Sequence, residues 1–341
     1  MSNYNVHLPS YSVGAGCYSE IPKVARRLGN KAVVIGGRTA IDKAKQALLD
    51  GIAGSDMKII DFIYGDDSTY ENVDKLVNDE RVKNADIIFG VGGGRAVDTT
   101  KVVADKLDKP LFTFPTLGSN CAAVTAICVM YNEDHTFKEY YYLEGPADHT
   151  FIDTQIIAES PEDLFWAGIG DALSKECEAV YSSKGVNLAH TPLMGVGVSK
   201  ICIEPLIKYG KKALEDCKNN QDSEELKQVA LDIIISTGIV SNLTTTENDY
   251  YYNSSLAHAF YNGSTLVEGA RGLHGEVVSF GVLTLLTCAG EIEKRNEIAA
   301  FNKSLGLPVC LADLGIDKSG IPTIVDKAVT LVEWNAIKDR V

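Results

Sequence analysis

The first 155 residues alternate between short apolar, β-branched runs and longer segments whose apolar residues recur at helical spacing. The most apolar runs predict buried strands at 31–37, 57–65, 85–93 and 109–116. The segments between them carry apolar residues every third or fourth position, as amphipathic helices do. Strands that alternate with helices pair in parallel and have both faces covered. The pattern therefore predicts an open parallel α/β sheet of the Rossmann-like, dinucleotide-binding type.

The pattern changes near residue 153. The runs 125–132 and 137–145 predict a hairpin added to the sheet, and 148–154 predicts a last strand. Beyond that point strand signals nearly vanish, and apolar residues recur at helical intervals to the end of the chain. We therefore expect two domains, an α/β dinucleotide-binding domain at 1–155 and an all-helical domain at 156–341.

Composition narrows the class of protein. Hydrophobic residues make up 45% of the chain and the formal net charge is −14. Nucleic acid is an unsuitable partner, because a phosphate backbone requires a basic surface. No apolar run reaches the roughly 18 residues of a membrane span, and the N-terminus lacks a secretory signal pattern. Eight scattered cysteines without a CxxC pair are typical of reduced thiols, so we expect a cytoplasmic location.

The strongest local signal is a glycine-rich turn between a predicted strand and a predicted helix. The segment Gly90–Lys101 reads GVGGGRAVDTTK, with three consecutive glycines at 92–94. Glycines let the backbone approach a pyrophosphate closely, and the helix N-terminus offers unpaired N–H groups. Arg95 stands where the usual GxGxxG fingerprint has its third glycine. A tight turn without a ligand remains the alternative.

Three further residues suggest a metal site. His258 and His274 each lie in or beside a predicted helix with glycine nearby, and Asp171 lies in the segment AGIGDALSKECEA. Two imidazoles and one carboxylate are a usual ligand set for a catalytic zinc ion that keeps one position open. Taken singly, each histidine is more often a core residue, and Asp171 could be the N-cap of a helix.

The motifs in combination resemble the glycerol dehydrogenases of the iron-containing alcohol dehydrogenase superfamily. The resemblance extends from about residue 6 to beyond 290, and it is carried by motifs that occur in the family's order: GVGGGRAVDTTK, FTFPTLGSNCAAVTAICVMY, AGIGDALSKECEA, LAHAFYNG and LHGEVVSFG. It implies a dehydroquinate synthase-like fold, with the active site in the cleft between an N-terminal α/β domain and a C-terminal helical domain. It also implies a homo-oligomer.

The resemblance assigns roles to individual residues. Asp171, His258 and His274 match the three metal ligands, which would hold one divalent ion, with zinc favoured over iron. The positions that match the cofactor's surroundings are Gly93, Gly94, Arg95, Thr116, Ser119, Thr125, Ile127 and Tyr131.

The chain departs from its relatives in this superfamily in four respects. Cys121 replaces an aspartate that touches substrate, and a thiol accepts hydrogen bonds poorly. Gly37 and Arg38 stand where an acid would bind the ribose 2′-OH of NAD, so NADP is also a candidate cofactor. Lys175, one turn after Asp171, replaces a fourth ligand in iron-type relatives and matches glycerol-1-phosphate dehydrogenases. Tyr261 replaces a histidine.

The sequence thus predicts NAD(P)-linked, reversible hydride transfer with a polyol or secondary alcohol, assisted by one divalent ion as Lewis acid. Lys175 and Cys121 are the candidate catalytic side chains. A pairing of Lys175 with an acid such as Glu178 is the structural alternative. Three other functions stay open: a dehydrogenase of a phosphorylated polyol such as glycerol-1-phosphate, a dehydroquinate synthase-type lyase, and a non-catalytic nucleotide-binding protein.

Overall fold

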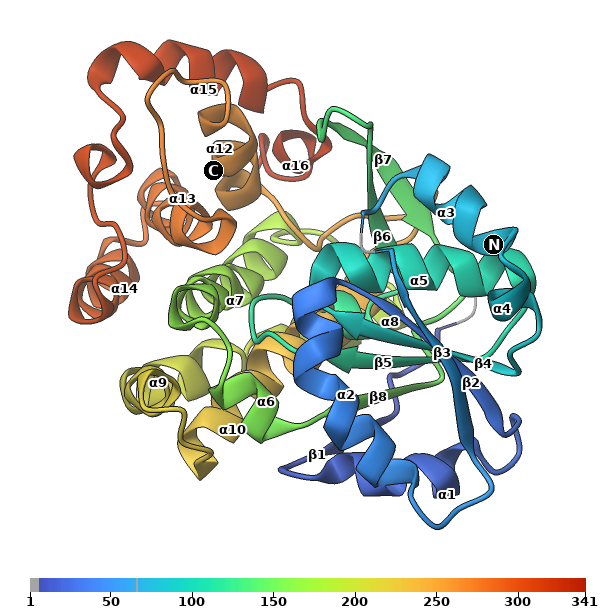
Figure 1. Cartoon of the computed structure of the whole chain (residues 1–341). Coiled ribbons are helices and arrows are strands. Elements are labelled where there is room, and N and C mark those ends of the chain that lie inside the picture. Colours follow the sequence, from blue (N-terminus) through green and yellow to red (C-terminus); the bar gives the residue numbers. More distant parts are fainter. Residues whose placement is uncertain (1–5, 66) are drawn as a thin grey trace.

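The N-terminal half is built on one parallel sheet. A computed structural model of the chain describes residues 6–65 and 67–341. Six strands lie in the order β1–β8–β5–β4–β2–β3 (Figure 1). Their bounds are β1 (Tyr11–Val13), β2 (Lys31–Gly36), β3 (Lys58–Tyr64), β4 (Ile87–Gly92), β5 (Leu111–Pro115) and β8 (His149–Ile152). The predicted parallel sheet is confirmed. Strand β1 was not expected from the sequence, because three residues are too few to show a periodicity.

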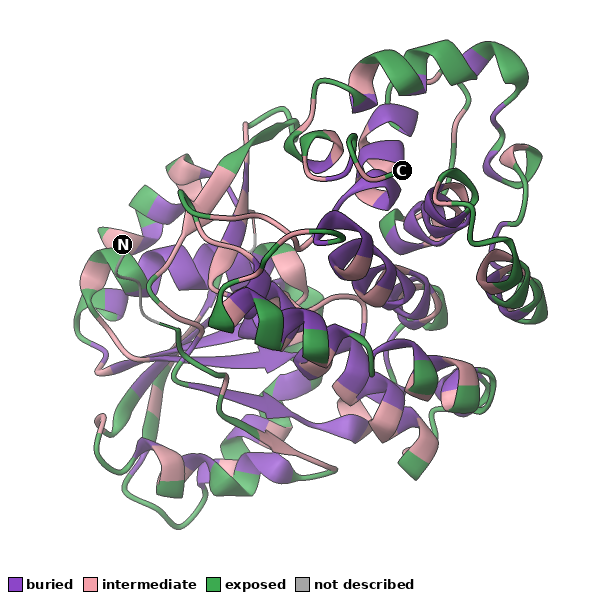
Figure 2. Ribbon diagram, turned by 180° about the vertical axis from the view of Figure 1, so that it is seen from behind, coloured by how far each residue is buried: buried purple, intermediate pink, exposed green. Residues whose placement is uncertain are grey.

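Both faces of this sheet are covered by helices. Alternate side chains of β2 enter opposite cores, with Ala32 and Val34 in one and Val33 and Ile35 in the other. Helices α1 (Ile21–Ala25) and α2 (Arg38–Ile52) supply the first core. The second contains residues of α3 (Tyr70–Val77), α4 (Glu80–Lys83) and α5 (Gly94–Leu107). Figure 2 shows the strands as buried throughout their centre. Burial on both faces explains why the strands are continuous apolar runs.

The predicted hairpin exists, but it is not part of the main sheet. Strands β6 (Ile127–Tyr131) and β7 (Phe137–Tyr142) form a separate antiparallel pair (Figure 1). Cys128 and Met130 pack from β6 into the core that α5 shares with the sheet. Because one face of the hairpin is buried against this helix, it lies over the helix layer instead of extending a sheet edge. The expectation of an added hairpin is corrected accordingly.

The C-terminal half is helical, as predicted. Its helices are α6 (Thr154–Ala158), α7 (Glu162–Ser182), α8 (His190–Ser199), α9 (Ile203–Lys218), α10 (Glu224–Leu231), α11 (Thr237–Thr244), α12 (Leu256–Ser264), α13 (His274–Cys288), α14 (Ile292–Leu305), α15 (Ile321–Ala328) and α16 (Val332–Asn335). Helix α7 lies at the centre of this half, packed against α9 and α13. The boundary between residues 155 and 156 stays a prediction.

A π-helical turn at Asp232–Ser236 joins α10 to α11. The resulting stretch Glu224–Thr244 is long and apolar enough to cross a membrane by length and composition alone, and 67% of its most apolar window is buried inside the protein. Such burial is what a core helix shows. All eight cysteines are free, and most are buried.

The strand order creates a crevice at the carboxyl ends of the strands. From β2 the chain moves to β3 on one side and then crosses to β4 on the other. The direction of winding therefore reverses between β2 and β4. In open α/β sheets, ligands bind at this switch point. Here β2 is followed by Gly37, and β4 by Gly93.

Candidate functional site

Three helices bring the predicted metal ligands together. Asp171 lies in the middle of α7, His258 in α12 and His274 at the first position of α13. One ligand atom from each residue lies within 4.8 Å of the others. Asp171 Oδ1 is 3.3 Å from Nε2 of His274 and 3.7 Å from Nε2 of His258. Since Asp171 lies inside a 21-residue helix, it is not an N-cap, and that alternative is wrong.

Glycines allow the close approach of these helices. A Cβ atom added to Gly275 would collide with the backbone oxygen of Ala167, and one added to Gly170 would lie 2.5 Å from that of Gly275. Helix α13 therefore contacts α7 backbone to backbone, one residue from His274 on one side and one residue from Asp171 on the other. The GIGD and HG sequences are required by this contact.

The cluster has the chemistry of a divalent-cation site. Asp171 Oδ1 is buried and, among the described residues, has no hydrogen-bond partner. Burial alone would raise the pKa of this carboxyl, but the two histidines and Lys175 outweigh it and lower the pKa to about 2. A carboxylate and two imidazole nitrogens suit Zn²⁺ and several other divalent ions. The His274 side chain is 44% exposed, so the cluster is open to solvent on one side.

A buried glutamate that the sequence did not single out as part of the metal site completes the cluster. Glu178 Oε2 lies 2.6 Å from His258 Nδ1, on the opposite side of the ring from Asp171. The alternative pairing of Lys175 with Glu178 is wrong, because Lys175 Nζ donates to Asn253 Oδ1 at 2.6 Å. The signal was present in the spacing, since residues 171, 175 and 178 share one face of a helix.

The glycine-rich turn lies at the switch point. Gly92 ends β4 with a φ of 144°, a conformation that favours glycine, and Gly94 begins α5. Arg95 is exposed and its guanidinium lies 4.6 Å from the centre of the Tyr131 ring. At the end of the neighbouring strand, Gly37 precedes α2, and Arg38 stacks on the ring of Tyr64. The turn thus leaves an N-terminal helix end and two guanidinium groups beside the crevice.

The segment after β5 is held by a buried ion pair that sequence reasoning missed. Lys101 Nζ lies 2.8 Å from Asp98 Oδ1 and donates to the backbone oxygens of Ala122 and Ile127. It also contacts the hydroxyl of Thr125, which is buried. Thr125 therefore faces the lysine and contributes to holding the segment.

The remaining predicted residues of the sheet half lie in β6 and in the segment that joins β5 to it. Thr116 is buried directly after β5, and its amide donates to Gly92 O. Ser119 is half-buried and its hydroxyl accepts a hydrogen bond from Asn120. Ile127 and Tyr131 are half-buried on the same face of β6. Cys121 is half-buried beside Gly238 of α11.

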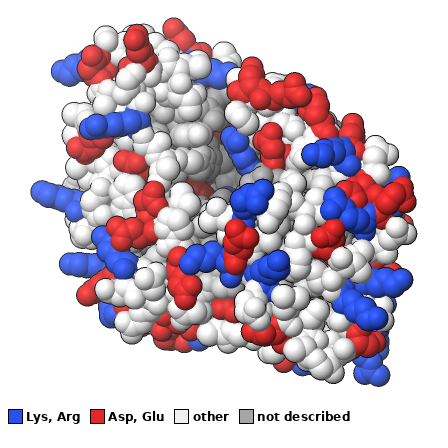
Figure 3. Space-filling view, viewed as in Figure 1, with Lys and Arg blue, Asp and Glu red and all other residues white. Residues whose placement is uncertain are grey.

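Tyr261 connects the two halves of the site. Its ring packs edge-on against His274, with centroids 4.3 Å apart. Its pKa is raised by burial and, to a smaller degree, by Tyr131 and Asp171. Tyr131 belongs to the sheet half and Asp171 to the helical half, so both lie near this ring. Figure 3 shows the surface hollowed between the C-terminal helices and the sheet half.

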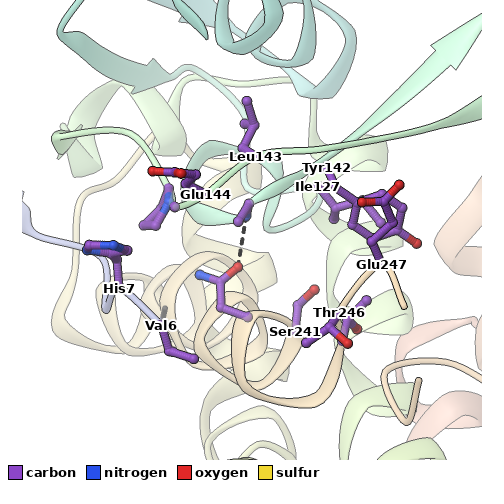
Figure 4. Close-up of a pocket in the computed structure, with 14 residues that line it drawn as sticks. Val6, His7, Ile127, Tyr142, Leu143, Glu144, Ser241, Thr246 and Glu247 are labelled. Carbon is purple, nitrogen blue, oxygen red and sulfur yellow. Dashed lines mark hydrogen bonds between the residues drawn. The ribbon is translucent and has the colours of Figure 1, made fainter. Parts of the chain in front are cut away.

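A second hollow lies elsewhere. A cavity of about 380 Å³ is bordered by the end of β7, the end of α11 and residues 6–7 (Figure 4). Of the predicted site residues only Ile127 lines it. The metal cluster and the glycine-rich turn are not part of this cavity, so the candidate site is the one between the two halves.

A family model, related sequences and a solved structure all point to the same group of alcohol and polyol oxidoreductases. The family model described as iron-containing alcohol dehydrogenase matches residues 9–154. A glycerol dehydrogenase of Thermotoga maritima is 30% identical over 320 residues, which cover 90% of this chain and 83% of that protein. A glycolaldehyde reductase of Halobacterium salinarum is 28% identical over 313 residues, covering 90% and 84%. The solved structure of glycerol dehydrogenase from Schizosaccharomyces pombe has a TM-score of 0.84 at 23% identity, covering 99% and 86%.

Proposed function

Since this chain belongs to the iron-containing alcohol dehydrogenase family, we propose that it is a metal-dependent, nicotinamide-linked oxidoreductase of a polyol or secondary alcohol. The observation that carries the proposal is the convergence of Asp171, His258 and His274 around one point that is open to solvent at His274. When bound, a divalent ion supplies Lewis acidity to the substrate oxygen and NAD(P) supplies the hydride acceptor.

The chain's own residues bind and orient these groups. Gly93 and Gly94 give the pyrophosphate access to the N-terminus of α5, where unpaired N–H groups and the helix dipole favour an anion. Tyr131 and Arg95 border this turn. The half-buried Tyr261 limits the entry of water next to His274. A water-poor, preorganised cleft of this kind favours hydride transfer by fixing donor and acceptor.

Replacement of a ligand tests the proposal. His274→Ala and Asp171→Ala are expected to abolish both the binding of a divalent metal and the NAD(P)-linked oxidation of polyols. Metal analysis measures the first, and the absorbance of the reduced cofactor at 340 nm measures the second. His190→Ala is the control, because His190 is exposed at the start of α8. A ligand variant that keeps most of its turnover would remove the metal from the mechanism.

The substrate is set by residues that differ from glycerol dehydrogenases. Cys121 offers a thiol where a carboxylate would accept a polyol hydroxyl, so we expect glycerol to be a poor substrate. Cys121→Asp should raise kcat/KM for glycerol more than for a simple secondary alcohol. An unchanged preference would show that position 121 does not contact the substrate.

A phosphorylated polyol is the second candidate, and Lys175 favours it. This lysine is buried one helical turn from Asp171, and its Nζ donates hydrogen bonds to the backbone and side-chain oxygens of Asn253. Comparing a polyol with its phosphate ester in the wild type and in Lys175→Ala tests the role. Selective loss of activity on the ester supports it, and an unchanged ester preference contradicts it.

The choice between NAD and NADP depends on Gly37 and Arg38. Gly37 leaves room after β2, and Arg38, stacked on Tyr64, presents a cation near the ribose position. We expect NADP to be accepted. Arg38→Ala should raise the KM for NADP selectively and leave that for NAD nearly unchanged.

The remaining assignments are also part of the proposal. We expect zinc to be preferred to iron, nucleic acid and membranes not to be partners, and the protein to be cytoplasmic. Homo-oligomerisation is supported by exposed apolar side chains at and just before β1 and on and just after α8, namely Leu8, Tyr11, Leu193, Met194 and Ile201. Light scattering on a size-exclusion column measures the mass directly, and a monomer would contradict the expectation.

A further inference from the structure

We propose that Glu178 is a positioning residue that fixes the tautomer and orientation of His258, and thereby sets the affinity of the site for a divalent ion. The inference rests on the proposed function, because it concerns the same cluster. Glu178 itself is not a member of the ligand group, since its carboxylate lies on the far side of the imidazole from Asp171.

Both carboxylate oxygens of Glu178 have hydrogen-bond partners. The side chain is fully buried in α7. Oε2 lies 2.6 Å from His258 Nδ1, while Oε1 accepts from the backbone amides of Ser255 at 2.7 Å and His258 at 3.1 Å. These amides belong to the N-terminus of α12, where backbone N–H groups have no partner within the helix. One carboxylate thus holds both the ring of His258 and the backbone that carries it.

The tautomer follows from these contacts. A carboxylate only accepts, so the proton of a neutral His258 resides on Nδ1. The lone pair is then on Nε2, the nitrogen that lies 3.7 Å from Asp171 Oδ1. An imidazole ligates a metal through an unprotonated nitrogen, and a carboxylate on the other nitrogen also increases its basicity.

Glutamine cannot replace this carboxylate, although it has the same shape. Its amide has one accepting oxygen and one donating nitrogen. If the oxygen faces the two backbone amides, the NH₂ group faces Nδ1 and moves the His258 proton to Nε2. If the oxygen faces Nδ1, the NH₂ group opposes two N–H donors. The first arrangement blocks the ligand atom, and the second displaces the start of α12.

The test compares Glu178→Gln with Glu176→Gln. Glu176 lies two residues away on the same helix, carries the same charge and pairs with Lys294 at 2.6 Å without contacting His258. Chelator-treated full-length proteins are titrated with Zn²⁺, and the visible spectrum of Co²⁺ is recorded at saturation. We expect Glu178→Gln to bind Zn²⁺ about 10- to 100-fold more weakly and to alter the Co²⁺ spectrum. Glu176→Gln should match the wild type.

The outcomes separate the two proposals. Wild-type Zn²⁺ affinity in Glu178→Gln would overturn the inference, and so would a lower Tm with an unchanged Co²⁺ spectrum, because that combination indicates only a cap for α12. If Glu178→Gln does not fold by circular dichroism, Glu178→Asp is used instead. Its carboxylate is one methylene shorter and cannot reach His258 Nδ1 at hydrogen-bond distance while the two helices stay in place, so weaker Zn²⁺ binding is expected and wild-type affinity would overturn the inference. Asp171→Ala tests the proposed function separately. If this variant still binds Zn²⁺ as the wild type does, the assignment of the metal site is wrong.

Discussion

The two halves of the molecule treat a buried carboxylate in opposite ways. In the sheet half, Asp98 of α5 faces Lys101 one turn later at 2.8 Å, and its second oxygen accepts from the amide of Val129. In the helical half, Asp171 of α7 faces two imidazole nitrogens, at 3.3 Å and 3.7 Å, and no lysine or arginine of the described residues lies within 4.0 Å of its carboxylate oxygens. The chain provides the first carboxylate with a cation, whereas the second is the one that we propose to receive a cation from solution.

The difference distinguishes a charged pair that stabilises the fold from a charged cluster that is able to bind a ligand. Lys101 is fully enclosed and bonded to backbone oxygens of the segment that follows β5, so its charge orders the loop beside the cofactor turn. The Asp171 cluster keeps an exposed side at His274. A buried group left incomplete costs stability unless a ligand completes it, which is why such groups mark binding sites.

The largest effect is expected from breaking the closed pair. Lys101→Met leaves Asp98 buried without its cation, and the loss of one partner of a buried pair costs about 3–5 kcal/mol. Urea unfolding measures this directly. Lys106→Met is the control, because Lys106 and Asp74 form an exposed pair worth about 0–1 kcal/mol. Equal losses in the free energy of unfolding for the two substitutions would show that the buried pair does not contribute more to stability than the exposed one.

The next effect concerns the helix contact that assembles the open cluster. Gly275→Ala introduces a methyl group against the backbone of Ala167, and overpacking of this kind costs about 1–3 kcal/mol. Because His274 is the adjacent residue, Zn²⁺ affinity should fall together with the free energy of unfolding. A variant that lost stability and kept full Zn²⁺ affinity would separate the helix contact from the site.

Asp232 sharpens the comparison, because no basic side chain of the described residues lies within 4.0 Å of this buried carboxyl. Burial raises its pKa well above 3.8, and the Ser236 hydroxyl offsets this only in part. The folded protein therefore holds a proton that the unfolded chain releases above pH 3.8, so the free energy of unfolding falls as pH rises. Asp232→Asn should match the wild type near pH 3 and exceed it increasingly toward pH 7. An equal pH dependence in urea titrations would contradict this.

The smallest effect is expected from a glycine without close neighbours, which serves as a reference for Gly275→Ala. Gly197 lies exposed in α8, and an added Cβ would meet nothing within 4 Å. Gly197→Ala should stabilise the protein by about 0.5–1 kcal/mol, because alanine loses less conformational freedom in a helix. Thermal unfolding would reveal the gain, and a loss would contradict the exposure of this face of α8 in solution.

Much of the sheet was predictable because its strands are buried on both faces and are therefore continuous apolar runs. The hairpin was misplaced for a related reason. The alternation in 127–131 shows that one face is buried, but it does not say whether a sheet or a helix covers that face. The three-residue strand β1 carried no periodicity at all.

The candidate site divides in the same way. Residue types and family motifs were sufficient to select Asp171, His258 and His274, because few side chains bind divalent ions. Glu178 and the Asp98–Lys101 pair were not selected. Their spacing on one helix face was visible in the sequence, but the contacts that give them a role, with His258 and with Ile127, join residues far apart in the chain. Thr125 was selected as a cofactor residue; its hydroxyl contacts Lys101, and its role toward the cofactor stays a prediction.

The sequence by itself determined the chemistry and the secondary structure of this protein, because residue type and periodicity are local properties. It fixed which side chains are able to hold an ion and where strands give way to helices. Only the tertiary structure decided which charged side chains are paired within the protein and which are left accessible to a ligand. That distinction depends on contacts across 77 to 80 residues, such as those of Glu178 with Ser255 and His258, and no local pattern records them.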